Sequence, residues 1–325
     1  MNRLDKVQLF SLLLLSGVWT VLCTPALSGT GGMLGAVIGC GIEVLLCLPL
    51  LRREVPELSG VIRQHRWLGL VYAAYFTIWG SFGFSQLHDA APEELHAWSG
   101  AAIVLLLLTC VYTSTSGLRT AGRAAPFLVV LLVLAVAVLT AGAWKRFVPE
   151  RLYLQTDGIR AGMLSYLAGS GELAAVWLLL GRLRGSGTAA VLCYLPARLG
   201  LFLLLFCLSI LAGGRLTASQ QYPFLTLTAL AQPLEGQRAD ALYLLAFVML
   251  FVMHLTLMTG LAGHCLTLLY PKAERFVPLL LPVMLLLSRM LPANALQLTA
   301  AVCMPVLTAG VPFFAGYGYK RRAAA

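Results

Sequence analysis

Four ionisable side chains stand near the middle of long apolar stretches of the sequence. They are Glu43, Glu172, Arg198 and His254. A charge at the centre of a bilayer costs at least about 2.5–3.5 kcal/mol on insertion scales. Residues of this kind are usually kept because they serve a ligand, a proton or a partner of opposite charge. Each of the four therefore needs a specific explanation.

The four side chains suggest two kinds of chemistry. Glu172 either binds a substrate amine or carries a proton, or it forms a structural ion pair with Arg198, which lies at a similar depth in the next apolar run. Glu43 is either a proton site or a helix-to-helix hydrogen bond made in its protonated form. His254 has no metal-ligand companion at helical spacing, so a packed, hydrogen-bonded histidine is favoured and no metal site is expected.

Two apolar runs are interrupted by residues that disfavour continuous helix. The first contains Ser16 and Gly17, and later Thr24 and Pro25; the sixth contains Gly-Ser-Gly-Glu at 169–172. Corresponding breaks in two halves of a chain are typical of inverted-repeat transporters, whose binding site forms at the unwound backbone. The alternative is that these small residues only allow helices to pack closely.

The elements that must position these residues are membrane-spanning helices. Hydrophobic residues make up 59% of the 325-residue chain and charged residues only 11%, well below the ~25% of soluble domains. We expect a single all-α membrane domain over 1–325, with a first repeat at about 8–144 and a second at about 162–316. The ten predicted spans are 8–27, 33–51, 67–86, 99–116, 126–144, 162–181, 189–213, 241–268, 277–291 and 298–316.

The distribution of basic residues predicts the orientation. With the N-terminus inside, most of the 23 Lys and Arg residues fall in the inner connections and at the two ends of the chain. Both termini are therefore expected in the cytoplasm. The net charge of +10 is explained by topology and by affinity for anionic lipid, without nucleic acid. Enzyme fingerprints are absent, so neither an enzyme nor a cofactor is expected.

Several segments, in their order and spacing, resemble the spore germination protein family, the B-subunit of germinant receptors. This family is related to the amino acid/polyamine/organocation transporters. The resemblance extends from the N-terminus to the tenth predicted span. It is carried by LDKVQLF at 4–10, GLRTAGR at 117–123 before Pro126 and Phe127, GSGELA at 169–174, YPFLTL at 222–227 and QRADAL at 237–242.

The resemblance implies a transporter-like fold of ten helices, an internal five-plus-five inverted repeat and broken helices 1 and 6. It also implies a subunit of the bacterial spore inner membrane that binds a small germinant, such as an amino acid, sugar or nucleoside. Its partners would be the larger A-subunit and a C-subunit lipoprotein. The implied pocket is lined by Ser16, Gly17, Gly169, Ser170, Gly171 and Glu172, with Tyr75, Trp79 and His254 beside it.

A cation-coupled amino acid carrier is the alternative function, because the same broken helices and the buried Glu172 suit a carrier. A sensor can keep a carrier's fold, so the residues alone separate the two poorly. A purely structural scaffold is the least favoured reading, since it has little reason to keep charges at mid-membrane depth.

Overall fold

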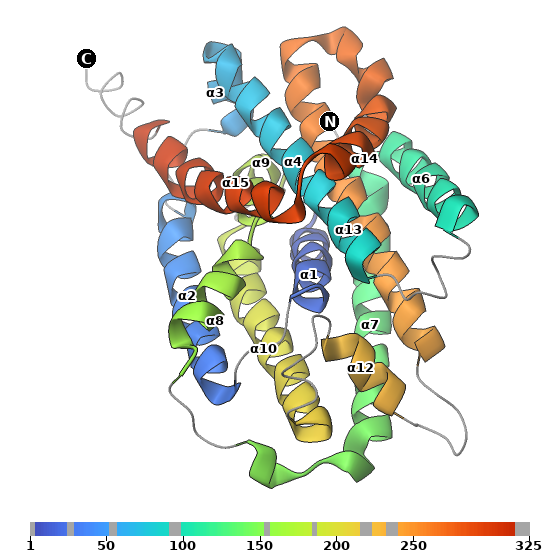
Figure 1. The fold of residues 1–325 in the computed structure, drawn as a ribbon. Helices are drawn as coiled ribbons and strands as arrows, with labels where there is room; N and C mark the ends of the chain where they lie inside the picture. The colour runs from blue at the N-terminus through green and yellow to red at the C-terminus, as the bar shows by residue number, and fades with distance from the viewer. Residues whose placement is uncertain are drawn as a thin grey trace.

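The computed structural model describes residues 4–24, 29–51, 57–90, 99–152, 157–183, 187–214, 223–231 and 240–315. These residues are almost entirely helical and contain no β-strand (Figure 1). The α-helices are α1 (Lys6–Leu22), α2 (Gly29–Leu51), α3 (Leu58–Gln64), α4 (Arg66–Ala90), α6 (Ser99–Ser116), α7 (Leu118–Ala143), α8 (Ile159–Ala168), α9 (Leu173–Leu180), α10 (Thr188–Gly213), α12 (Pro223–Leu230), α13 (Asp240–Leu269), α14 (Leu280–Met290) and α15 (Ala293–Pro305). Short 3₁₀ segments cover η1 (Trp144–Arg146), η2 (Pro149–Arg151) and η3 (Pro271–Leu279), and a π-helical turn, η4 (Val306–Gly310), continues α15.

Helix α1 begins with a capping box. The Asp5 backbone N–H donates to Oε1 of Gln8 at 3.1 Å, and the Asp5 side chain accepts in return from the backbone of Gln8. The helix then runs without interruption to Leu22, so the predicted break at Ser16 and Gly17 is wrong. One glycine is tolerated in a helix that is packed on nearly every side, because tertiary contacts outweigh its low propensity. Pro25 lies outside the described residues.

Six of the described helical segments are long and apolar enough to cross a membrane, which makes the chain a multi-pass, all-α membrane protein. They are Gly29–Leu51, Leu118–Arg146, Ile159–Leu180, Thr188–Gly213, Leu245–Leu269 and Ala293–Ala315. Each matches one of the ten predicted spans.

The remaining four predicted spans are not among these six long apolar segments. α1 is a shorter apolar helix and α4 is long but more polar, whereas α6 has the same bounds as the predicted span at 99–116. The predicted span at 277–291 begins in η3 and continues as α14, whose 11 residues cover about 16 Å at 1.5 Å per residue. That length is about half of a bilayer core, so α14 cannot cross alone. Ten crossings and the inverted repeat remain predictions.

Segments predicted to face the cytoplasm meet at one end of the bundle. The Leu4 N–H donates to the carbonyl of Arg182 at 2.9 Å, and the Leu4 side chain packs against Gly122 in the first turns of α7. Gly69, near the start of α4, lies against Leu269 at the end of α13. The starts of α1, α4 and α7 and the ends of α9 and α13 therefore share one end.

Segments predicted to lie on the outer side of the membrane contact one another, away from the cytoplasmic segments named above. Arg151, after α7, donates to the carbonyls of Leu211 and Ala212 at the end of α10, at 3.1 and 2.6 Å. Nη1 of Arg289 in α14 lies 3.3 Å from Nε2 of His88 near the end of α4. Both sets of contacts agree with the predicted alternation of connections. Which end faces the cytoplasm stays a prediction.

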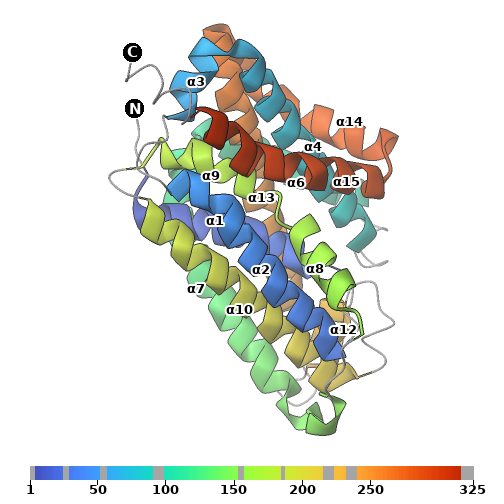
Figure 2. The ribbon, with the colours of Figure 1, turned by 90° about the vertical axis from the view of Figure 1, so that its left-hand side faces the viewer.

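The centre of the bundle is α1, which contacts α7, α10 and α13 and is buried along almost its whole length from Leu9 to Leu22. Figure 2 shows α10 between α2 and α7, with the three helices running nearly parallel to one another. Helix α8 packs on α2 with hardly any space between the backbones, because a Cβ on Gly35 would overlap the backbone of Ile159 and one on Gly162 would overlap Gly32. Glycine at these positions holds α8 directly on α2.

Candidate functional site

The sixth predicted span is broken where the sequence predicts it. α8 ends at Ala168, Gly169 caps it, and α9 begins at Leu173. Between the two helices the Ser170 N–H donates to the carbonyl of Leu167 at 3.1 Å. The helical hydrogen-bond ladder is thereby replaced by tight turns. Backbone carbonyls and one carboxylate are placed in the interior of an apolar bundle.

Side chains from two other helices bind the backbone carbonyls of this break. The Thr20 hydroxyl in α1 lies 2.7 Å from the carbonyl of Gly169, and the Tyr75 hydroxyl in α4 donates to the carbonyl of Gly171 at 2.7 Å. An unpaired carbonyl in a low-dielectric interior is costly, so these hydroxyls are what allow the break to stay buried. Helices α1 and α4 are thus attached directly to residues 169–171.

Arg198 stands at the centre of the charged groups. Its Nη1 donates to Oε1 of Glu43 at 2.6 Å and to Oγ of Ser170 at 2.9 Å, and its Nε lies 3.3 Å from Oε1 of Glu172. The guanidinium carbon sits 4.6 Å from the centre of the Tyr166 ring, within range of a cation–π contact. One guanidinium therefore joins a carboxylate from α2 to the carboxylate at the helix break.

The carboxylate of Glu172 has a second partner on α10. The Tyr194 hydroxyl donates to Oε1 of Glu172 at 2.5 Å. Tyr194 precedes Arg198 by four residues on the same helix, so both side chains point to one face one turn apart. Glu43 and Glu172 are 0% exposed and Arg198 is 1% exposed. The second carboxylate oxygens, Oε2 of both glutamates, have no hydrogen-bond partner among the described residues.

Gly17 makes room for this cluster. A Cβ on Gly17 would lie 2.9 Å from Cδ of Arg198, from Oε1 of Glu172 and from the hydroxyl oxygen of Tyr194. The glycine lets α1 pass directly over the charged groups without breaking. The residue singled out in the sequence is thus part of the site, although its role is steric and not that of a helix break.

A second polar group adjoins the first on α1, α4 and α13. Oγ of Ser16 lies 2.9 Å from Nδ1 of His254, whose ring is 6.3 Å from that of Trp79 and 6.4 Å from that of Trp19. The Trp79 ring also packs against Gly171, where a Cβ would overlap it. The Nε1 atoms of both tryptophans and Nε2 of His254 are buried without a hydrogen-bond partner among the described residues. His254 is thus packed and hydrogen-bonded.

The structure brings together every residue that the sequence analysis proposed for the pocket. These are Ser16, Gly17, Tyr75, Trp79, Gly169, Ser170, Gly171, Glu172 and His254, joined by Glu43 and Arg198. Both readings of Arg198 and Glu172 are compatible with this geometry, since the predicted ion pair forms at the helix break itself. Whether the residues bind a ligand remains a proposal.

Three residues of the cluster were missed by sequence reasoning: Thr20, Tyr166 and Tyr194. Helical spacing was the available signal for two of them, because Tyr166 precedes Ser170 by four residues and Tyr194 precedes Arg198 by four. Thr20 carries no such signal, since its partner Gly169 is 149 residues away. The participation of Glu43 beside Arg198 is likewise a long-range contact, over 155 residues.

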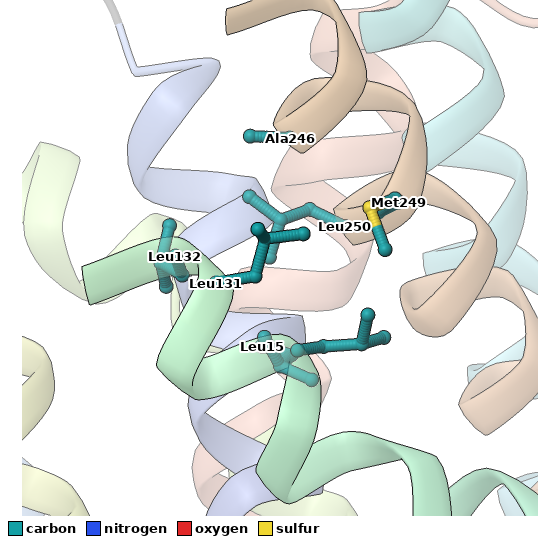
Figure 3. Close-up of a pocket in the computed structure, with 7 residues that line it drawn as sticks. Leu15, Leu131, Leu132, Ala246, Met249 and Leu250 are labelled. Atoms are coloured by element: carbon teal, nitrogen blue, oxygen red, sulfur yellow. The ribbon is translucent and has the colours of Figure 1, made fainter. Parts of the chain in front are cut away.

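The structure also contains a pocket whose lining is apolar, unlike the polar cluster described above (Figure 3). It is lined by aliphatic side chains of α1, α7 and α13, namely Leu15, Leu128, Leu131, Leu132, Ala246, Met249 and Leu250. It offers no side-chain donor or acceptor to a polar solute. Among the described residues no group of three His, Cys, Asp or Glu side chains is placed to hold a metal ion.

Comparison with known proteins adds no assignment: no protein-family model matches the chain, and no curated protein matches it at a significant level.

Proposed function

We propose that this chain is the membrane subunit of a spore nutrient-germinant receptor that binds a small germinant, an amino acid, and triggers germination. The observation that carries the proposal is the helix break at 169–172, where Glu172 meets Arg198 and Glu43 in the interior of the bundle. Polar backbone and charge at this depth are typical of solute sites in transporter-like folds. The receptor role is proposed from the ordered sequence motifs that resemble the spore germination protein family.

The charge of the cluster favours a ligand with an ammonium group. Two carboxylates face one guanidinium, which leaves an excess of negative charge when both glutamates are ionised. The carbonyls of Gly169 and Gly171 add partial negative charge at the same place. An amino acid brings a cation that suits this surplus, while its carboxylate suits N–H donors such as Nε1 of Trp79.

The site as described is closed, since its side chains are fully buried. Ligand binding therefore requires that helices around the break separate, which is how transporter-like proteins admit a solute. The hydroxyl contacts of Thr20 and Tyr75 are the ones that such a movement would break. In a receptor this movement would be passed to the proposed A-subunit and C-subunit lipoprotein in the spore inner membrane, with both termini of this chain in the cytoplasm.

The test is nutrient-triggered germination of spores that lack this chain, beside uptake of amino acids by vegetative cells of the same strain. We expect germination to be lost toward at least one nutrient, with uptake intact, and to return when the gene is restored. Normal germination toward every nutrient tested, in a strain without a paralogue, would overturn the receptor role.

A cation-coupled amino acid carrier is the second candidate, and the surplus carboxylate favours it. A group that gains and loses a cation during a transport cycle is what coupling requires. Purified chain in liposomes would then concentrate a labelled amino acid under a proton or sodium gradient. Binding without gradient-driven uptake would reject the carrier and leave the receptor.

A further inference from the structure

The hydroxyl of Ser170 touches three polar atoms at the centre of the cluster. Its Oγ lies 2.8 Å from the carbonyl oxygen of Tyr166 and 2.9 Å from Nη1 of Arg198, and it is in still closer contact with Oε1 of Glu43. A serine hydroxyl has one hydrogen to donate and two lone pairs that accept. Three contacts therefore use its full capacity, provided that two of the neighbours are donors.

Hydrogen counting then separates the two states of Glu43. Arg198 is a donor and the Tyr166 carbonyl is an acceptor. If Glu43 is ionised, both Glu43 and the Tyr166 carbonyl are acceptors, and Ser170 has one hydrogen for the two. The Ser170 oxygen then touches one of these two acceptor oxygens with no hydrogen between them. If Glu43 is protonated, it donates to Ser170, Ser170 donates to Tyr166, and every contact is a hydrogen bond.

Glu172 has the opposite surroundings. Its Oε1 receives a hydrogen bond from the Tyr194 hydroxyl at 2.5 Å and faces Nε of Arg198 at 3.3 Å. The Tyr194 hydroxyl is a hydrogen-bond donor, and the guanidinium adds positive charge, although Nε of Arg198 makes no hydrogen bond among the described residues. A donor and a cation beside one oxygen are the environment of an ionised carboxylate.

We propose that Glu43 is a proton-binding site, and that its proton makes the closed cluster neutral while Glu172 and Arg198 form the ion pair. An unpaired buried carboxylate costs several kcal/mol, and a proton on Glu43 removes that cost without a metal ion or a further ligand. The proton is held between Oε1 of Glu43 and Oγ of Ser170. This assignment does not rest on the proposed function, because it concerns the purified chain alone.

Among the described residues, Arg198 is the one positively charged group that faces Glu43, and the same guanidinium also faces Glu172, so one cation serves two carboxyl groups. α1 contributes Gly17 and Thr20 to the cluster, beside Arg198 and Gly169, and neither residue titrates. The titratable groups around Glu43 among the described residues are two thiols on its own helix, two phenols and the charged pair, that is Cys40, Cys47, Tyr166, Tyr194, Glu172 and Arg198.

The experiment is infrared spectroscopy of the purified chain in a detergent without ester groups, near neutral pH, where exposed carboxyls are ionised. A protonated buried carboxyl gives a C=O stretch that is absent from carboxylates. We expect this band in the wild type and its loss in Glu43→Gln. Absence of the band from the wild type, or its persistence in Glu43→Gln, would overturn the proposal.

Two further variants decide which carboxyl holds the proton. Ser170→Ala removes the acceptor of the Glu43 proton, so the band is expected to shift to higher wavenumber. Tyr194→Phe removes a hydrogen bond to Glu172 only, and is expected to leave the band in place. A shift in Tyr194→Phe and none in Ser170→Ala would assign the proton to Glu172 and overturn the proposal. The folded state of each variant is checked by its circular dichroism and elution profile.

Discussion

Thr20 and Gly169 are joined across the centre of the bundle, with the threonine hydroxyl 2.7 Å from the glycine carbonyl and also 2.7 Å from the carbonyl of Gly17 in its own helix. A single hydroxyl thus links the intact helix α1 to the broken span. Its one hydrogen is shared between the two carbonyls, and the carbonyl of Gly169 is one that the break has removed from the helical ladder.

Thr20→Val should destabilise the chain. The substitution keeps the shape of the side chain but leaves the Gly169 carbonyl without its donor, and an unsatisfied buried acceptor costs about 1–3 kcal/mol. Thermal unfolding in detergent should show a lower midpoint. The matched control is Thr140→Val, because among the described residues the Thr140 hydroxyl bonds only to the Val136 carbonyl of its own helix. Equal midpoints for the two variants would contradict a special role for the Thr20 contact.

Gly17→Ala should disturb the cluster by steric overlap. The new methyl would lie 2.9 Å from atoms of Arg198, Glu172 and Tyr194, and overpacking typically costs about 1–3 kcal/mol. Gly200→Ala is the control, since a Cβ there meets nothing within 4 Å and alanine favours helix. We expect reduced stability in the first variant and no loss in the second. Similar stability in both would mean that α1 can shift without harm.

Arg198→Met should be strongly destabilising, because it leaves two buried carboxyl groups without their cation. Removing one partner of a buried ion pair costs about 3–5 kcal/mol. The double variant Arg198→Met with Glu172→Gln should recover part of the loss, because it removes the stranded charge as well. Additive destabilisation in the double variant, measured by denaturant or thermal unfolding, would show that the two residues are not coupled.

Glu172→Gln should assemble in the membrane but respond weakly or not at all to the ligand. The amide keeps the size of the side chain and loses the negative charge proposed to hold an ammonium group. Germination rate, or binding of a labelled amino acid, measures the response at matched protein levels. Glu57→Gln serves as the control, because Glu57 is exposed before α3. An unchanged response in Glu172→Gln would reduce Glu172 to a packing role.

Ligand binding should depend on pH if an ammonium group displaces the proton of Glu43. A proton and a cationic ligand that compete for one carboxylate make the apparent affinity rise as pH rises. Titration of a labelled amino acid at several pH values measures this slope. The glutamine of Glu43→Gln has no acidic proton to release, so the apparent affinity of this variant should depend less on pH. An identical slope in both proteins would separate the proton site from ligand binding.

The amino-acid sequence by itself determined that the protein is an all-α membrane protein, and it marked most residues of the candidate site. Long apolar runs require helices because lipid offers no partner to the backbone, and the six long apolar helices follow from that constraint. The run Gly-Ser-Gly-Glu at 169–172 breaks its helix because glycine disfavours helix. Charges within apolar runs marked Glu43, Glu172 and Arg198 as exceptional.

Tertiary structure alone decided whether Ser16 and Gly17 break their helix and which side chains meet at the site. Local propensity predicted a break at Gly17, but α1 is packed on almost every side and the missing side chain is used as space for Arg198 and Tyr194. The contact of Glu43 with Arg198 joins residues 155 positions apart. Helical periodicity relates neighbours within a few turns, whereas a contact of this range depends on how whole helices pack, so no local pattern encodes it.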